Sequence, residues 1–344
     1  MESRNRFVRL SGLLAVIVLL GAWHLSGGML SVEAGDSINA EWSQWRGPNR
    51  DGISHETGLL KSWPAGGPKV IWRVPLGDGY SGISISQGHI YTMYAKGDDE
   101  FVVCLNASNG KEMWRFRTDS KFTNDRGDGP RSMPTVDGDT VFALGAKGKL
   151  YALHSKNGEK VWEHDFVKEF GSSIPGWGFA TSPIVEGDLL LVEAGGVAGK
   201  SIVAFNKKSG GVVWTSHTDE AAYSSPIAIT FNGIRQVIFL TSQTLLSVSP
   251  KDGQIYWKYP WPEGINIATP ILIPEDKIFI SASYDKGAVL VKMKTAQGKN
   301  TAEEIWKSRV MKNHFNSSVL RGNYLYGFAD GTLKCIEVNT GEEQ

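Results

Sequence analysis

The sequence contains very little cysteine, no excess of either charge and no grouping of metal-binding side chains. Its 344 residues include two cysteines, and its 36 lysines and arginines balance 36 aspartates and glutamates. A net charge of zero gives no field that would attract nucleic acid or an anionic membrane. The seven histidines form no pair at zinc-ligand spacing, and the chain has no Gly-x-Ser-x-Gly elbow or phosphate-binding loop. Any function must therefore be argued from individual sites.

The two cysteines stand at equivalent positions of a repeated segment. Cys104 lies ten residues before Trp114, and Cys335 lies ten residues before the position that would follow Gln344. Other copies of the segment hold a small residue there: Ala152, Ala204 or Ser247. Small, strand-interior positions in distant copies favour buried free thiols over a disulfide. Neither cysteine is near the N-terminal apolar run, so a lipid-modified cysteine has no candidate.

The N-terminus has the pattern of an export signal. Three arginines precede an apolar run at 10–25, and "VEA" at 32–34 offers small residues before a cleavage point. The run is shorter than the ~20 residues that a spanning helix usually needs, which favours a cleaved signal peptide at 1–34 over a retained anchor. Either segment would insert in the membrane at least transiently. Both alternatives export the rest of the chain, to the periplasm or to the outer face of the inner membrane.

Tryptophans recur at a nearly regular spacing along the chain. Six of them are separated by 42, 48, 52, 43 and 49 residues: Trp72, Trp114, Trp162, Trp214, Trp257 and Trp306. Several follow a glycine turn and a run of alternating apolar residues, as in "NGKEMW" (109–114) and "DGQIYW" (252–257). A large aromatic side chain at a fixed place in each repeat predicts a packing role between repeats.

Each period contains about four short strands. One follows a Ser-x-Pro-like element such as "TSPIVEGDLLLVEA" (181–194), one follows its turn, one carries the small residue, and one ends on tryptophan. Four-stranded units of 40–50 residues are typical of β-propeller blades. We predict an all-β fold, a β-propeller of four-stranded blades, with about seven blades in this chain and seven or eight in the complete protein.

The repeat resembles the pyrroloquinoline-quinone-like family of quinoprotein propellers. Its blades share the phrase A-x-(D/N)-x-x-(S/T/N)-G-x-x-x-W, seen here at 104–114, 152–162 and 204–214. The resemblance extends from Trp42 onward, and "WSQWRGPNRDG" (42–52) is similar to the N-terminal segment of exported bacterial members. The chain stops one residue before the next tryptophan is due. We therefore expect the propeller domain, 35–344, to be incomplete at its C-terminus.

Propeller ligands usually bind around the central channel, where the innermost strands begin. Aligning the repeats places one side chain per blade at that point: Tyr80, Arg131, Ala180, Tyr223, Ile267 and Phe315. Trp177, between two glycines, is a further candidate that either stacks on a planar ligand or plugs the funnel. We take Tyr80, Arg131, Trp177, Tyr223 and Phe315 as candidate binding residues and assign no catalytic or metal-binding residue.

Two loops leave alternatives open. The polar segment 118–132 contains Asp119, Asp125 and Asp128, whose spacing does not match a calcium loop, so we read it as a solvated connection between blades. Arg126 and Arg131 in this segment could bind an anion, while hydrogen bonds to backbone carbonyls of neighbouring blades are an alternative for Arg131. Trp261, in "YPWPEG" (259–264), is a candidate for exposed aromatic surface.

The family name suggests pyrroloquinoline quinone (PQQ) with calcium as cofactor. Such a site needs six to eight oxygen ligands around the ion, several of them carboxylates. The aligned positions contain no Asp or Glu, and the chain has no Cys-Cys pair and is much shorter than quinoprotein dehydrogenases. We therefore expect no cofactor, since a repeat defines a fold and not a function.

The resemblance favours an exported, monomeric, non-catalytic binding or scaffolding protein with a protein or peptide partner in the cell envelope. This chain is similar to the propeller subunit of the outer-membrane β-barrel assembly machinery, although that subunit is a lipoprotein. Two alternatives stay open: a PQQ-dependent alcohol or sugar dehydrogenase, and a carbohydrate-processing partner with an aromatic platform.

Overall fold

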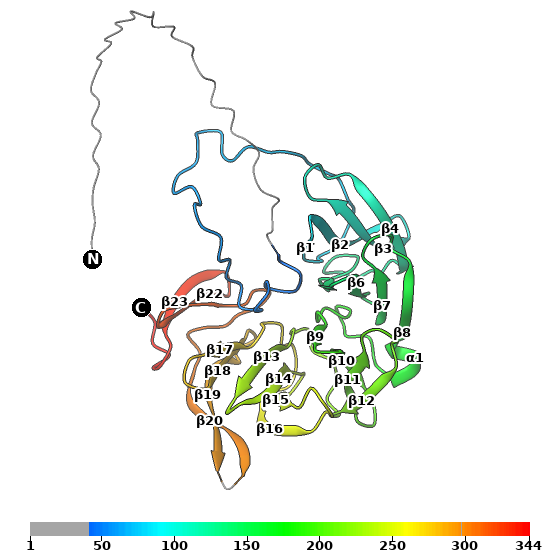
Figure 1. Cartoon of the computed structure of the whole chain (residues 1–344). Helices are drawn as coiled ribbons and strands as arrows, with labels where there is room; N and C mark the ends of the chain where they lie inside the picture. The colour runs from blue at the N-terminus through cyan, green and yellow to red at the C-terminus, as the bar shows by residue number, and fades with distance from the viewer. Residues whose placement is uncertain (1–40, 297) are drawn as a thin grey trace, which may run out of the picture. The chain divides into compact units, whose positions relative to one another are not determined.

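The alternating apolar residues of each repeat form antiparallel sheets, of which the described residues contain six (Figure 1). The structure is a computed structural model that describes residues 41–296 and 298–344, all within the unit Ile38–Gln344. The expected signal peptide or anchor at 1–34 lies outside these residues. Within the described part of the chain, no helix is both long and apolar enough to cross a membrane.

The strands fall into four classes by their order within each sheet. The first strands are β1 (Ser84–Ser86), β5 (Thr135–Asp137), β9 (Ile184–Glu186), β13 (Ile227–Phe231), β17 (Ile271–Ile273) and β21 (Val319–Arg321). The second strands are β2 (His89–Lys96), β6 (Thr140–Leu144), β10 (Leu189–Gly196), β14 (Ile234–Leu240), β18 (Lys277–Ala282) and β22 (Tyr324–Ala329). The third strands are β3 (Asp99–Asn106), β7 (Lys149–His154), β11 (Lys200–Asn206), β15 (Thr244–Val248), β19 (Gly287–Ala296) and β23 (Thr332–Glu337). The fourth strands are β4 (Glu112–Ser120), β8 (Lys160–Asp165), β12 (Val212–Ser216), β16 (Ile255–Pro260) and β20 (Lys299–Ser308).

These sheets confirm the predicted β-propeller. Each pairs its strands in chain order, and the described residues contain a single short helix, α1 (Phe166–Phe170), which follows β8. The sixth sheet has three strands, and an isolated bridge joins Ile336 of β23 to Glu343. We expected about seven blades in this chain, and the described residues form six sheets.

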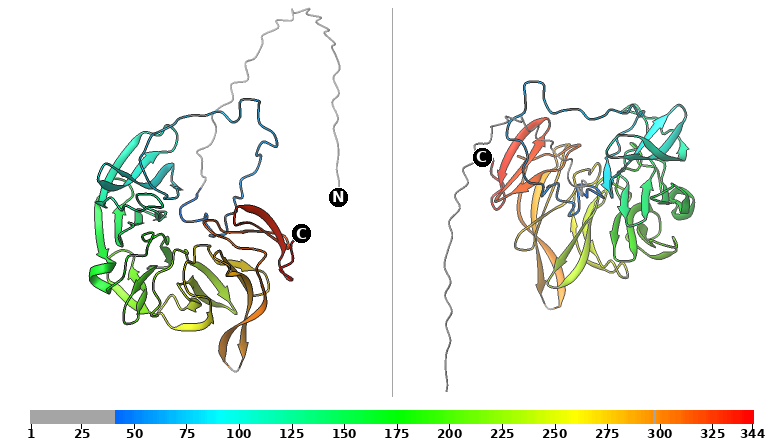
Figure 2. Two further views of the ribbon diagram at one scale, coloured as in Figure 1. Left: turned by 180° about the vertical axis from the view of Figure 1, so that it is seen from behind. Right: turned by 45° about the horizontal axis from the view of Figure 1, so that its top comes forward.

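The sheets follow one another around a central channel, with their first strands innermost (Figures 1 and 2). First strands of neighbouring sheets are in contact, as β1 with β5 and β17 with β21. Five of the apolar clusters each combine buried side chains of two consecutive sheets. Each blade therefore depends on its neighbour for burial of its faces, as expected of a repeat fold.

The repeated tryptophans connect each sheet to the next. Five indole N–H groups donate to a carbonyl in the turn between the third and fourth strands of the following sheet, at 2.8–3.1 Å. The indole rings also cover a glycine of that turn so closely that a Cβ there would lie 2.5–2.8 Å from the ring. The pairs are Trp72–Gly110, Trp114–Gly158, Trp162–Gly210, Trp214–Gly253 and Trp306–Gly341.

Trp257 is the exception among these tryptophans. The next sheet joins its third and fourth strands by a long hairpin, β19–β20, instead of a short glycine turn. Trp257 is buried, and its indole N–H has no hydrogen-bond partner among the described residues.

The small-residue positions are explained by strand register. Cys104, Ala152, Ala204 and Ser247 lie directly opposite the tryptophan of the same sheet. Cys104 is buried and Cys335 is partly buried, and both are free thiols. A small side chain leaves room for the indole ring on the adjacent strand.

The segment 41–53 crosses the channel and connects the sheets from inside. Trp42 pairs with Ile85 beside the first sheet, and the carbonyl of Ser43 accepts from Val136 N–H at 2.7 Å in the second. We call this segment the channel strap.

Three side chains of the channel strap reach the other four sheets. The guanidinium of Arg50 is buried and donates to carbonyls of Ser182, Pro183 and Pro226, just before the first strands of the third and fourth sheets. Trp45 Nε1 donates to Thr269 Oγ1 at 2.7 Å, and Arg46 donates to the carbonyl of Ser318 at 2.8 Å. The strap therefore touches all six sheets.

Candidate functional site

A cavity of about 580 Å³ opens at the end of the channel where the first strands begin. Its lining includes the aligned residue of every sheet: Tyr80, Arg131, Ala180, Tyr223, Ile267 and Phe315. Trp45, Arg126, Trp177, Ser225 and Ser317 complete it. The structure thus brings all five candidate binding residues together. We call this space the mouth cavity and this end of the sheets the mouth face.

The lining is aromatic and cationic. Tyr80 and Phe315 are 62% and 66% exposed at the rim, whereas Trp177 and Tyr223 are partly buried. Two arginines, two serines and the tyrosine hydroxyls supply polar groups, and among the described residues no Asp or Glu lines the cavity. Such a surface complements an apolar or aromatic group that carries negative charge.

Arg131 organises the first part of this lining. Its guanidinium donates to the carbonyl of Gly127 at 2.5 Å and to that of Gly129. It also lies over the rings of Phe122 at 4.8 Å and Tyr80 at 5.6 Å. Hydrogen bonds to carbonyls of neighbouring blades were the alternative offered for Arg131 from the sequence. The carbonyls that it contacts belong instead to its own loop. Burial lowers the pKa of Arg131 below its usual range and is the chief cause of the shift.

Arg126 is the more available cation. It is exposed, and among the described residues its guanidinium has no ion-pair or hydrogen-bond partner. Its backbone is fixed, because its N–H donates to Asn124 Oδ1 at 3.0 Å and its carbonyl accepts from Tyr80 Oη at 3.1 Å. The loop therefore presents a free guanidinium at a defined place on the rim.

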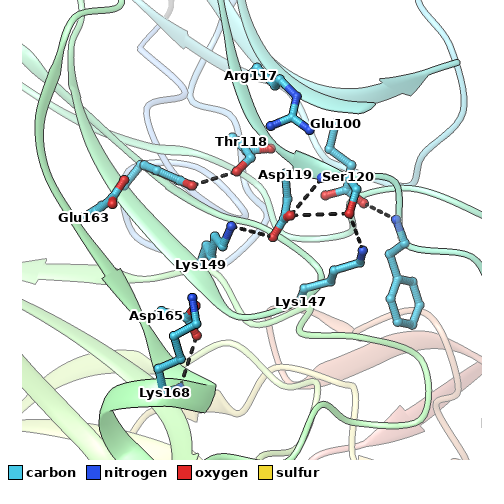
Figure 3. Close-up of polar contacts among 12 residues, drawn as sticks. Glu100, Arg117, Thr118, Asp119, Ser120, Lys147, Lys149, Glu163, Asp165 and Lys168 are labelled. Carbon is cyan, nitrogen blue, oxygen red and sulfur yellow. Dashed lines mark hydrogen bonds and ion pairs between the residues drawn. The ribbon is translucent and has the colours of Figure 1, made fainter. Parts of the chain in front are cut away.

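Polar contacts fix the start of the loop 118–132, which carries Arg126 and Arg131 (Figure 3). Asp119 pairs with Lys149 at 3.2 Å, and Lys147 Nζ donates to Ser120 Oγ at 2.7 Å. Buried Glu100 accepts from the N–H of Phe122 at 3.0 Å. The loop that carries both arginines is held at its start by the first and second sheets.

Trp177 lies between the third sheet and two others. Its ring centroid is 5.3 Å from that of Tyr223 and 5.6 Å from that of Phe315. Its backbone N–H donates to Tyr223 Oη at 3.2 Å. Its loop is also tied to the first loop, since Asn124 Nδ2 donates to the carbonyl of Gly176 at 2.8 Å. Trp177 thus contributes one wall of the mouth cavity in a defined position.

The channel strap separates the mouth cavity from a second space. Trp45 lines the mouth cavity, while Gln44, Arg50 and Asp51 line a cavity of about 400 Å³ that lies along the first strands β9, β13 and β17. Arg50 is charged at neutral pH, although burial lowers its pKa to about 9.

The acidic residues of 118–132 do not form a cation site. Asp119 is paired with Lys149, and Asp128 lies 3.4 Å from Lys121 and accepts from the N–H of Asn124. Within 41–296 and 298–344, no three His, Cys, Asp or Glu residues are grouped to hold a metal ion. The mouth cavity also lacks the carboxylates that calcium requires. Its donor set does not fit the calcium of a PQQ site.

Trp261, a candidate for exposed aromatic surface, is buried. This residue is only 3% exposed, and its Nε1 donates to Asn266 Oδ1 at 3.1 Å.

Two residues at the site, Trp45 and His314, were not identified from the sequence. Trp45 belongs to the strap far from the repeats, and His314 lies one residue before an aligned position. The His314 ring is 3.8 Å from that of Phe315, and its Nε2 is 3.0 Å from Tyr284 Oη.

The fold and the convergent channel residues define a β-propeller of the quinoprotein type. A family model described as outer membrane protein assembly factor BamB matches residues 61–174 and 129–344. The chain belongs to this family of PQQ-like repeat proteins.

Individual relatives are distant. Tetrathionate hydrolase from Acidithiobacillus ferrooxidans is 22% identical over 232 residues, 63% of this chain and 44% of that protein. Quinoprotein alcohol dehydrogenase PedH from Pseudomonas putida is 22% identical over 177 residues, 46% of this chain and 28% of that protein. This chain therefore spans less than half the length of either curated relative. The crystal structure of BamB from Moraxella catarrhalis has a TM-score of 0.54 at 16% identity, covering 78% of this chain and 72% of that one, which supports the fold alone.

Proposed function

We propose that this protein is an exported, non-catalytic binding or scaffolding protein of the cell envelope, whose mouth cavity receives part of a protein or peptide partner. The convergence of one side chain from each sheet on a single cavity without carboxylates carries this proposal. The membership of the BamB family supports it. Export rests on the N-terminal sequence pattern, which lies outside the described residues.

The rigidity of the site supports a binding role. The channel strap fixes the first strands from inside, and Arg131 and Trp177 are held by hydrogen bonds from their own and neighbouring loops. A preorganised surface loses little conformational entropy when a partner binds. The exposed rings of Tyr80 and Phe315 leave apolar area for a partner to cover.

A PQQ-dependent dehydrogenase is the alternative, because PedH is a quinoprotein alcohol dehydrogenase. The donor set disfavours it, since calcium would find aromatic rings and arginines in place of carboxylates. No reaction step can be derived from the side chains of this cavity.

Reconstitution separates the two functions. Purified protein is titrated with PQQ and calcium chloride while quinone absorbance and dye reduction with an alcohol are followed. A binding protein gives no saturable absorbance change that depends on calcium and no dye reduction. Saturable, calcium-dependent uptake with turnover would overturn the proposed function.

A further inference from the structure

A third cavity of about 500 Å³ opens next to the mouth cavity, and it is strongly basic. Its lining contains three cations and one carboxylate: Pro262, Tyr284, Asp285, Lys286, Lys307, Ser308 and Arg309. No aligned repeat position falls in it, and neither the fold nor the proposed function accounts for it. We call it the basic shelf.

Chain topology places the basic shelf on the mouth face. In a four-stranded antiparallel sheet, connections alternate between its two ends. The turn between β18 and β19, which holds Tyr284 and Lys286, therefore lies at the same end as the segments before each first strand. The ends of β16 and β20, which lead to Pro262 and Arg309, are also at that end.

A ridge of two aromatic side chains joins the two cavities. Tyr284 lines the basic shelf, and its ring packs edge-on against His314 at 5.1 Å. His314 in turn contacts Trp177, at 6.3 Å between centroids, and Phe315, both of which line the mouth cavity. An extended ligand that lies along the ridge would contact the aromatic mouth cavity and the basic shelf at the same time.

The shelf cations are held but not neutralised. Lys286 Nζ donates to Asn266 Oδ1 at 3.0 Å and to the carbonyl of Ile265 at 3.3 Å, and neither acceptor carries a charge. Lys307 Nζ lies over the ring of Trp261 at 5.5 Å. Lys307 and Arg309 are exposed and have no ion-pair partner within the residues that the structure describes.

The one shelf carboxylate does not cancel this charge. Asp285 is 81% exposed at its side chain, and its nearest cation is Lys312 at 3.9 Å. Together the two cavities present five cations, Arg126, Arg131, Lys286, Lys307 and Arg309, against this single carboxylate. In a chain with a net charge of zero, the linings of the two cavities thus have a local positive excess.

We propose that the mouth face docks an acidic, extended segment of a partner protein, with an aromatic side chain in the mouth cavity and carboxylates on the basic shelf. This inference rests on the proposed function and specifies the chemistry of the partner. Two separate cavities along one ridge suit an extended segment better than a compact small molecule. Cations opposite carboxylates would accelerate association and set the direction of the segment.

The test uses a fluorescent peptide of about ten residues, roughly 33 Å when extended, with two phenylalanines followed by a run of Glu and Asp. Binding to the full chain is measured by anisotropy at two salt concentrations. Comparison peptides replace the acidic run by Lys or the phenylalanines by Ser. The double variant K307E/R309E is compared with K208E/K251E, which makes the same charge change at exposed turns between third and fourth strands, at the other end of the sheets.

The acidic aromatic peptide should bind and weaken with salt, and K307E/R309E should lower its affinity by roughly tenfold. Trp177→Ala should weaken binding without changing the salt dependence, and K208E/K251E should bind as the parent does. Equal loss in both double variants, or equal binding of the lysine peptide, would refute the acidic-segment proposal. If free PQQ or another small anion binds the parent and every peptide fails, the segment proposal is wrong. The proposed function itself fails only if that PQQ also turns over.

Discussion

The indole ring of Trp114 covers Gly158 of the next sheet, and its Nε1 donates to the carbonyl of Ser155 at 2.8 Å. The same contact recurs at three other sheet boundaries, and Trp72, which precedes the first sheet, makes it with Gly110. The glycine turn of one sheet therefore packs against the tryptophan of the sheet before it. The repeated glycine turn and tryptophan therefore stabilise the packing between blades. The candidate binding site lies at the opposite ends of the sheets.

Gly158→Ala should destabilise the protein more than a matched glycine substitution. Gly158 has a φ of +73°, and a Cβ would lie 2.6 Å from Trp114 Cε3. Strained backbone and overpacking should together cost about 2–4 kcal/mol in the free energy of unfolding. Gly233 has the same φ of +73° with nothing within 4 Å, so Gly233→Ala should cost only about 1–2 kcal/mol. Urea unfolding of both variants measures the difference, and equal losses would contradict the contact.

The sequence was sufficient to predict the sheets and their joints because both depend on local, repeated features. Apolar alternation defines the strands, a glycine with positive φ defines the turn, and the small residue at Cys104 faces Trp114 by register. The alignment also predicted which residues surround the channel. The role of Arg50 could not be predicted, because its carbonyl partners are more than 130 positions away in the chain.

Arg50→Met should weaken the link between the third and fourth sheets. The substitution leaves the carbonyls of Ser182 and Pro226, now 3.2 and 2.9 Å from the guanidinium, without a charged donor. We expect a loss of about 3 kcal/mol in the free energy of unfolding, measured in urea. Arg115→Ala removes an exposed arginine paired with Glu112 and should change the free energy of unfolding far less than Arg50→Met does. Similar losses for the two variants would show that the strap does not support the channel.

Glu193→Gln should stabilise the protein increasingly as pH rises. Glu193 is fully buried, one carboxyl oxygen accepts from the N–H of Ala222, and the other has no partner among the described residues. Burial, assisted by Asp219, raises the pKa of Glu193 well above its usual value. The parent therefore loses stability as pH rises from the unfolded pKa through the folded one. Gln keeps the acceptor and cannot ionise.

The melting temperature at pH 5 and pH 8 measures this effect. The advantage of Glu193→Gln should be small at pH 5 and about 3 °C or more at pH 8. Glu159→Gln, at an exposed turn, is the control and should show no such trend. A pH-independent difference for Glu193→Gln would mean that burial does not shift the titration of this group.

The two thiols should differ in reactivity. Burial raises the pKa of Cys104 to about 11, so it holds little thiolate at neutral pH, whereas Cys335 is partly exposed. A thiol reagent should modify one cysteine rapidly in the native protein and two in guanidinium. Cys335→Ser should abolish the rapid phase. The absence of any free thiol in denaturant would contradict the prediction of free cysteines.

Sequence reasoning identified candidate residues at the mouth but not the surface around them. Trp261 was a candidate for exposed aromatic surface, yet its Nε1 donates to Asn266 and its ring lies under Lys307. Whether an aromatic residue is buried depends on loops from neighbouring sheets, and local spacing carries no information on them. The basic shelf was missed for the same reason, because its cations come from two segments that are distant in the chain, the β18–β19 turn and the end of β20.

Site-specific photocrosslinking in the producing cell tests the central claim most directly. A photoreactive phenylalanine analogue replaces Phe315 in the mouth cavity or Lys208 at the far ends of the sheets. We predict a discrete protein adduct from position 315 that weakens in the Trp177→Ala background, and none from position 208. Adducts of equal yield from both positions, or none from position 315, would contradict a binding role for the mouth cavity.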